Sequence, residues 1–66
     1  MLKLAGETLM ECCERIHASE PPEELDDVQA SAYRGLSALA GHFFNKGHQQ
    51  AGISALRTLE LMLEGK

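Results

Sequence analysis

The sequence predicts an all-α fold of three helices, with a short first helix followed by a long antiparallel helical hairpin. Apolar residues recur every three or four positions along most of the chain, which is the spacing of one helix face. Two helix breaks, Pro21-Pro22 and Asn45-Lys46-Gly47, divide the chain into three such segments. Residues 1–66 are expected to form a single small helical domain. Because a chain of this length buries a modest share of its surface, we expect oligomerisation or a partner to complete the core.

The first helix is predicted over residues 2–18. Its apolar side chains alternate three and four positions apart, as in a heptad seam. This seam consists of Leu2, Ala5, Leu9, Cys12 and Ile16. The double proline ends the helix, because a residue before proline avoids the helical conformation.

The second helix is predicted from about Pro22 to Asn45 or Lys46. Proline fits the first turn of a helix, and acidic residues there complement the positive end of the helix dipole. These acids are Glu23, Glu24, Asp26 and Asp27. A stripe at helical spacing is predicted to face the core. It consists of Leu25, Val28, Ala32, Leu36, Leu39 and Phe43, and Tyr33, Ala40 and Phe44 widen it.

The opposite face of the second helix carries small residues where a solvated helix normally carries Lys and Glu. They include Ala30, Ser31, Ser37, Ala38 and Gly41. Small side chains let the backbone of another helix come close. We expect this face to be a second packing surface; the alternative is an ordinary exposed face of low polarity.

The third helix is predicted from His48 to Leu63, and a frayed end is expected at Gly65-Lys66. Its central stripe consists of Gly52, Leu56, Leu59 and Leu63. Leu61 lies nearly opposite this stripe, so it is expected to be exposed. The short turn at Gly47 makes the second and third helices antiparallel neighbours.

The net charge of −4 is distributed unevenly. Residues 1–27 hold eight acids and two bases, whereas residues 28–66 hold two acids and four bases. The scattered bases form no stripe for phosphates, which disfavours nucleic-acid binding.

Residues 28–45 are too polar to span a membrane, and the N-terminus has no signal-peptide pattern. We therefore expect a cytoplasmic protein without a membrane partner. The acidic segment 20–27 is expected to be a solvated helix start, with a basic partner as the alternative.

Cys12, Cys13 and His17 are the best candidates for chemistry. Cys13 and His17 are four positions apart, so they share a helix face and could hold a soft metal ion. Two ligands do not complete a site, and free cysteines behave as small apolar residues. We expect no metal and no cofactor.

The sequence contains no legible catalytic triad, phosphate loop or carboxylate pair, and we expect no enzymatic activity.

Part of the chain resembles a single tetratricopeptide repeat. The matching positions are Leu36, Leu39-Ala40, Phe43, Gly47, Gly52, Leu56 and Leu59. The repeat's usual proline after the second helix is absent, and Gly52 stands where alanine is usual. The resemblance covers residues 36–59 and implies a binder of peptides or helices from a partner protein, such as an adaptor or a chaperone of helical subunits.

A second segment, Ala51-Gly52-Ile53-Ser54, resembles the turn of a DNA-binding helix-turn-helix. The positions that should hold an aliphatic residue and an alanine before the turn are occupied by Gly47 and His48. Thr58 stands where the recognition helix should pack an aliphatic residue.

Taken together, these features predict a non-enzymatic protein–protein interaction module, a small adaptor or chaperone-like partner that packs helices on exposed apolar faces. The contact surface is expected on the first-helix seam or on the small-residue face. The expected partner-binding residues are Leu2, Leu9, Ile16, Ala30, Ala38, Gly41 and Leu61. The partner is another protein or a second copy of the chain. The alternative is a homodimeric regulator, linked to DNA by the helix-turn-helix or sensing metal or thiol state through Cys12, Cys13 and His17.

Overall fold

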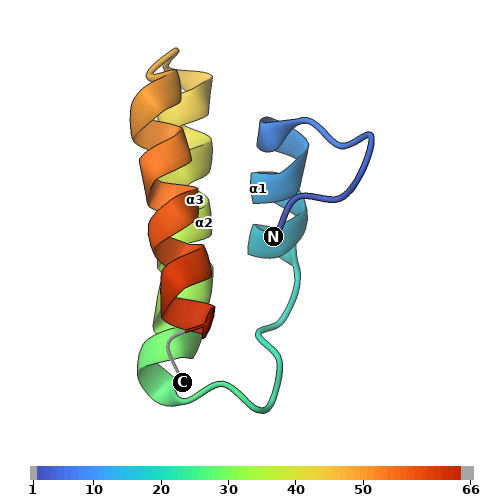
Figure 1. The fold of residues 1–66 in the computed structure, drawn as a ribbon, viewed down its shortest axis with the longest axis vertical. Coiled ribbons are helices and arrows are strands. Elements are labelled where there is room, and N and C mark those ends of the chain that lie inside the picture. The colour runs from blue at the N-terminus through green and yellow to red at the C-terminus, as the bar shows by residue number, and fades with distance from the viewer. Residues whose placement is uncertain (1, 65–66) are drawn as a thin grey trace.

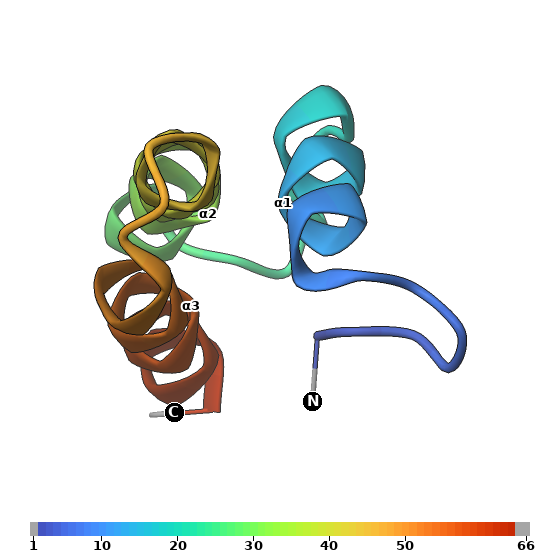
Figure 2. The same ribbon diagram turned by 90° about the horizontal axis from the view of Figure 1, so that it is seen from above.

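The computed structural model describes residues 2–64, which fold into three helices (Figure 1). They are α1 (Leu9–Ala18), α2 (Asp27–Asn45) and α3 (Gln49–Glu64). Helices α2 and α3 form an antiparallel hairpin, and α1 packs mainly beside α2, as the view from above shows (Figure 2). The predicted all-α fold with a short first helix and a long hairpin is confirmed. The expected frayed end at Gly65-Lys66 lies outside the described residues.

The first helix is shorter than predicted, because it begins at Leu9 rather than at residue 2. Thr8 is its N-cap: the Thr8 hydroxyl accepts a hydrogen bond from Glu11 N at 3.0 Å, and the Glu11 carboxylate accepts one from Thr8 N at 2.8 Å. This capping box satisfies two backbone donors that a helix start leaves unpaired. Upstream, Gly6 adopts a φ of 81°, which breaks any continuous helix.

Residues 2–8, here called the N-terminal strap, fold back over α1 (Figure 1). The Arg15 guanidinium holds the strap by donating to Leu2 O at 2.7 Å and to the Glu7 carboxylate at 2.8 Å. The hydrogen bond from Arg15 lowers the pKa of the Glu7 carboxyl below its ordinary value of 4.5. The same contact raises the pKa of Arg15.

The second helix also begins later than predicted. Pro21 and Pro22 precede it outside any helix, and Leu25 N donates to Pro22 O at 3.2 Å in a turn. Asp26 is the N-cap, in a capping box with Gln29, so that among the predicted acids only Asp27 lies in the first helical turn. A side-chain cap that accepts backbone donors therefore sets this helix start, and the prolines do not.

The turn between α2 and α3 agrees with the prediction. Gly47 adopts a φ of 82°, a conformation that glycine reaches without strain, and His48 N donates to Phe43 O at 2.8 Å. Residues Ala51 to Ser54 lie inside α3, so they do not form the turn that a helix-turn-helix requires.

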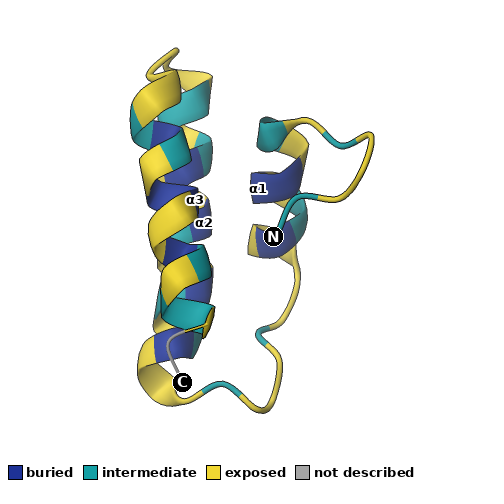
Figure 3. Cartoon of the chain, viewed as in Figure 1, coloured by how far each residue is buried: buried dark blue, intermediate teal, exposed yellow. Residues whose placement is uncertain are grey.

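Helix α2 turns only part of the predicted face to the core. Its buried residues are Gln29, Tyr33, Ser37 and Ala40. Val28 is 67% exposed and Leu39 is 44% exposed, although both belong to the predicted core stripe. Figure 3 shows that the buried residues follow the faces that α1 and the hairpin turn toward one another. The predicted core face of α2 is therefore confirmed in part. Tyr33 and Ala40 are buried, and Leu25, Ala32 and Leu36 pack on the core cluster. The prediction was wrong for Val28 and Leu39, because neither neighbouring helix covers that edge of the face.

The two polar side chains buried on α2 are both hydrogen-bonded. The Ser37 hydroxyl donates to Tyr33 O at 2.7 Å, and Gln29 Nε2 donates to Met62 O on α3 at 2.9 Å. A buried polar group costs little stability once it is hydrogen-bonded. This face of α2 can therefore be buried although it carries Gln29 and Ser37.

Candidate functional site

The predicted first-helix seam lies largely within the chain's own core. Ile16 is 1% exposed and belongs to a cluster with Cys12, Tyr33 and Leu59. Leu2 packs on this cluster, and Leu9 packs on a second cluster that contains Cys13, Ala40, Ala55 and Leu56. Leu2 and Leu9 are half-buried. In this structure Ile16 has no surface to offer a partner, and the binding roles of Leu2 and Leu9 stay predictions.

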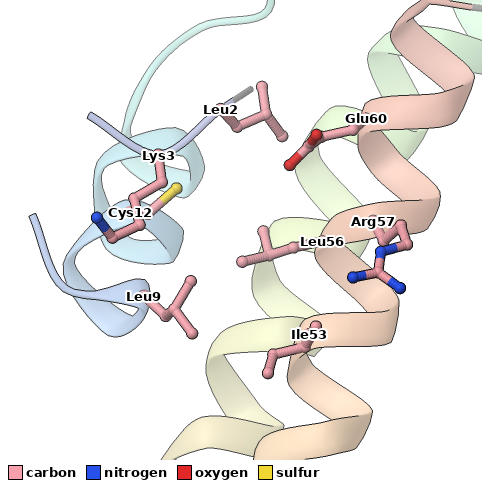
Figure 4. Close-up of a pocket in the computed structure, with 8 residues that line it drawn as sticks. All are labelled: Leu2, Lys3, Leu9, Cys12, Ile53, Leu56, Arg57 and Glu60. Atoms are coloured by element: carbon pink, nitrogen blue, oxygen red, sulfur yellow. The ribbon is translucent and has the colours of Figure 1, made fainter. Parts of the chain in front are cut away.

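A shallow groove lies between the strap and α1 on one side and α3 on the other. Figure 4 shows Leu2 and Leu9 facing Ile53 and Leu56 across it, with Glu60 close to Leu2 at one end. Lys3, Cys12 and Arg57 complete its lining. Its volume of about 160 Å³ is below the roughly 300 Å³ of a typical small-molecule site. The groove has room for one or two side chains of a partner and is too small for a cofactor.

The small-residue face of α2 is partly covered by α1. Ser37 is buried, and a Cβ at Gly41 would lie 3.5 Å from the Cβ of Cys13, an ordinary packing distance. Ala30 is half-buried, whereas Ala38 is exposed. The prediction that this face packs against another helix holds for Ser37 and Gly41, and the helix that covers them is the chain's own α1.

Cys13 and His17 line a small hollow beside this face. The hollow also contains Glu14, Ser37, Ala38 and Gly41. Burial raises the pKa of the Cys13 thiol to about 11, and burial likewise raises the pKa of Cys12. Both cysteines are free, and His17 is exposed. A thiol with a raised pKa is a poor metal ligand and a poor nucleophile. Residues 2–64 contain no cluster of three or more His, Cys, Asp or Glu that could hold a metal ion.

A third surface, which we call the outer flank, runs along α2. It consists of Val28, Ala32, Gly35, Leu39 and His42, all exposed except Ala32, which is half-buried at the edge and packs on the core. Val28 and Ser37 are nine positions apart, and at about 100° per residue they lie on opposite sides of the helix. Since α1 covers Ser37, the outer flank faces away from α1, on the open side of the hairpin in Figure 2.

Large apolar side chains are exposed on both helices of the hairpin. Val28 and Leu39 are both exposed, and Leu61 on α3 is 64% exposed. The bond between Gln29 and Met62 O places Val28 and Leu61 at the same end of the hairpin. The prediction that Leu61 is exposed is confirmed. Sequence reasoning missed Val28 and Leu39, because helical spacing shows that residues share a face and leaves open whether that face is covered.

The charges follow the length of the hairpin. Residues 28–59 contain no Asp or Glu, and their cations are Arg34, Lys46 and Arg57. The acids lie at the other end, before and at the start of α2 and at the end of α3. They are Glu23, Glu24, Asp26, Asp27, Glu60 and Glu64. The open end of the hairpin is therefore acidic, and Lys46 brings a positive charge to the turn end, while Arg34 and Arg57 lie between the ends.

Comparisons with protein-family models, with curated proteins and with solved structures found no match for this chain. Among the described residues, no helix is both long enough and apolar enough to cross a membrane.

Proposed function

We propose that this chain is a non-enzymatic protein–protein interaction module, a small adaptor or chaperone-like partner, and that it binds through the outer flank of α2. The observation that carries the proposal is the exposure of Val28 and Leu39 on one side of a hairpin that α1 covers on the other side only. Apolar surface of this kind favours association, at roughly 25 cal/mol for each Å² removed from water.

The mechanism is helix packing. A partner helix lies along α2 and covers side chains that recur four and three positions apart, the spacing by which one helix face meets another. The small residues Ala32 and Gly35 lie between the larger Val28 and Leu39, so they let the partner backbone come close. The tetratricopeptide resemblance over residues 36–59 points to the same class of ligand, a helix or peptide of a partner.

A thiol or metal sensor is the less favoured function. The observation against it is that Cys12 and Cys13 are 0% and 1% exposed and have raised pKa values, so little thiolate is present at neutral pH. Two free thiols in the core fit a reducing compartment, and we propose a cytoplasmic location on this ground.

Site-specific photo-crosslinking in cells that express the chain tests the proposal. A photoreactive amino acid at position 39 is expected to give a discrete protein adduct, which weakens when Val28→Glu is added. The same amino acid at Glu14, which is exposed on α1, serves as the control. Adducts no stronger at position 39 than at position 14 would overturn the proposal for this surface.

A further inference from the structure

We infer that the outer flank binds a second copy of this chain, with the two α2 helices antiparallel and crossing at Gly35. This inference rests on the proposed function, because it names the partner of the same surface. Three observations on α2 carry it: the spacing of the flank, the open space at Gly35, and the opposite charges at the two helix ends.

The outer flank has the spacing of a helix–helix seam. Val28, Ala32, Gly35, Leu39 and His42 follow one another at steps of four, three, four and three. This heptad pattern keeps one stripe facing a partner helix along its length. Its four exposed positions, which are available to another chain, are Val28, Gly35, Leu39 and His42. Ala32, at the edge of the stripe, packs in part on the chain's own core.

Gly35 is a helix-interior glycine that the chain's own packing does not explain. Glycine in this position disfavours the helix, and a Cβ added at Gly35 would meet no atom within 4 Å in the described part of the chain. Gly52, in contrast, lies against Phe44, where an added Cβ would come within 2.6 Å of a ring atom. A second helix that crosses α2 at Gly35 supplies the close approach that makes a glycine useful there.

The charges along α2 are complementary to themselves in an antiparallel pair. Glu24 lies in the turn just before α2, Lys46 is the C-cap at the other end, and both are exposed. Crossing at Gly35 therefore brings Glu24 of each copy toward Lys46 of the other. A parallel pair would instead place the acidic ends together, where like charges repel. In a two-fold dimer the same surface of both copies meets, so that surface must be complementary to itself. A helix with opposite charges at its two ends has this property, which favours a second copy over an unrelated helix.

The side chains also alternate in size across the crossing. Val28 and His42 are equally far from Gly35, so they face each other, and Leu39 of one copy packs beside Ala32 of the other. In each of these pairs a large apolar side chain of one copy meets a small or polar side chain of the other. The two Gly35 residues meet at the centre of the crossing.

The solution mass of the purified full chain provides the first test. Light scattering over a concentration series is expected to show the 7.2 kDa chain approaching twice that mass. Gly35→Leu is expected to weaken the dimer about a hundredfold or more, because two bulky side chains then block the crossing. Arg34→Leu, which introduces the same side chain at the neighbouring exposed position, is the matched control and is expected to keep the dimer.

Helicity from circular dichroism on the same samples separates loss of dimer from loss of fold. A chain that stays monomeric at every concentration, or a Gly35→Leu chain that dimerises as well as Arg34→Leu, would overturn the inference. The proposed function would survive that result if position 39 still crosslinks to a different protein in cells, and it would fail separately if position 39 gives no adduct.

A charge exchange tests the antiparallel orientation. Glu24→Lys and Lys46→Glu are each expected to weaken the dimer roughly threefold to tenfold at low salt, since each disturbs two exposed ion pairs. The double variant restores the opposite charges and is expected to recover most of the affinity. Glu20→Lys, in the loop before α2, is the control for net charge. A double variant no tighter than the weaker single variant would overturn the antiparallel pairing.

Discussion

Cys12 and Cys13 are adjacent on α1, yet each is buried in a different apolar cluster. Neighbouring residues on a helix point about 100° apart, so both clusters must wrap around α1 for this to occur. The strap and α3 cover the Cys12 side, which lines the groove, and α2 covers the Cys13 side at Gly41. Cysteine suits this place because it is small and apolar.

The first prediction concerns the reactivity of these two thiols. Both are buried and have pKa values raised chiefly by burial, that of Cys13 to about 11. We expect both to react with a thiol reagent at neutral pH at least about a hundredfold more slowly in the folded chain than in denaturant. Stopped-flow absorbance with a chromogenic disulfide measures this ratio. Rapid reaction of either thiol in the native state would contradict the packing of α1.

The second prediction concerns the contact between Glu7 and Arg15. The pKa of Glu7 is lower in the folded chain than its ordinary 4.5, so the folded state favours the ionised carboxylate. The contact therefore contributes fully above pH 4.5 and is lost as the pH falls through the lower folded value. Leu4 N donates to Glu7 at 2.9 Å, so the protection of the Leu4 amide from exchange, taken relative to the intrinsic rate at each pH, should fall as Glu7 is protonated. In Glu7→Gln this acid-dependent step should be absent.

Among the elements, α2 carries most of the difference between prediction and structure. Tyr33 and Ala40 were predicted as core and are buried, but the core also takes in Ser37 and leaves Val28 and Leu39 of the predicted stripe exposed. Ser37 is acceptable there because its hydroxyl bonds to a carbonyl of its own helix, one turn back. A serine whose hydroxyl bonds to a carbonyl of its own helix can therefore be buried as a small core residue, although its polarity in the sequence predicts exposure.

The third prediction compares two helix-interior glycines. Gly35→Ala should raise the free energy of unfolding by about 1 kcal/mol, because alanine favours the helix and its Cβ has open space. Gly52→Ala should lower it by about 1 kcal/mol, because displacing the Phe44 ring outweighs the helix preference. Urea unfolding at low protein concentration, where self-association contributes least, measures both values. Equal signs for the two variants would contradict the close approach of α2 and α3 at Gly52.

For the whole molecule, the hairpin has α1 on one side and an apolar flank on the other, with opposite charge at its two ends. A dimer built on that flank makes stability depend on protein concentration by mass action. The fourth prediction is that the unfolding temperature rises with concentration, by several degrees over about a hundredfold. Differential scanning calorimetry measures this shift, and Gly35→Leu should abolish it. A transition independent of concentration would contradict self-association at the whole-molecule scale.

Residues close together in the sequence determined the helices and their order. Gly47 ends α2 and makes the turn, the double proline separates α1 from α2, and the spacing of apolar residues predicts helices throughout. These features depend on backbone conformations that neighbouring residues permit or forbid, so they are legible from the chain alone.

Only the tertiary structure decided where the strap goes and which face of each helix is covered. Arg15 reaches back to Leu2 O and Glu7, a contact that no helical spacing indicates, and Gln29 is buried because Met62 O lies opposite it. Periodicity defines which residues share a face. Whether that face is core or surface depends on which helix lies against it, and this is settled by contacts between distant parts of the chain.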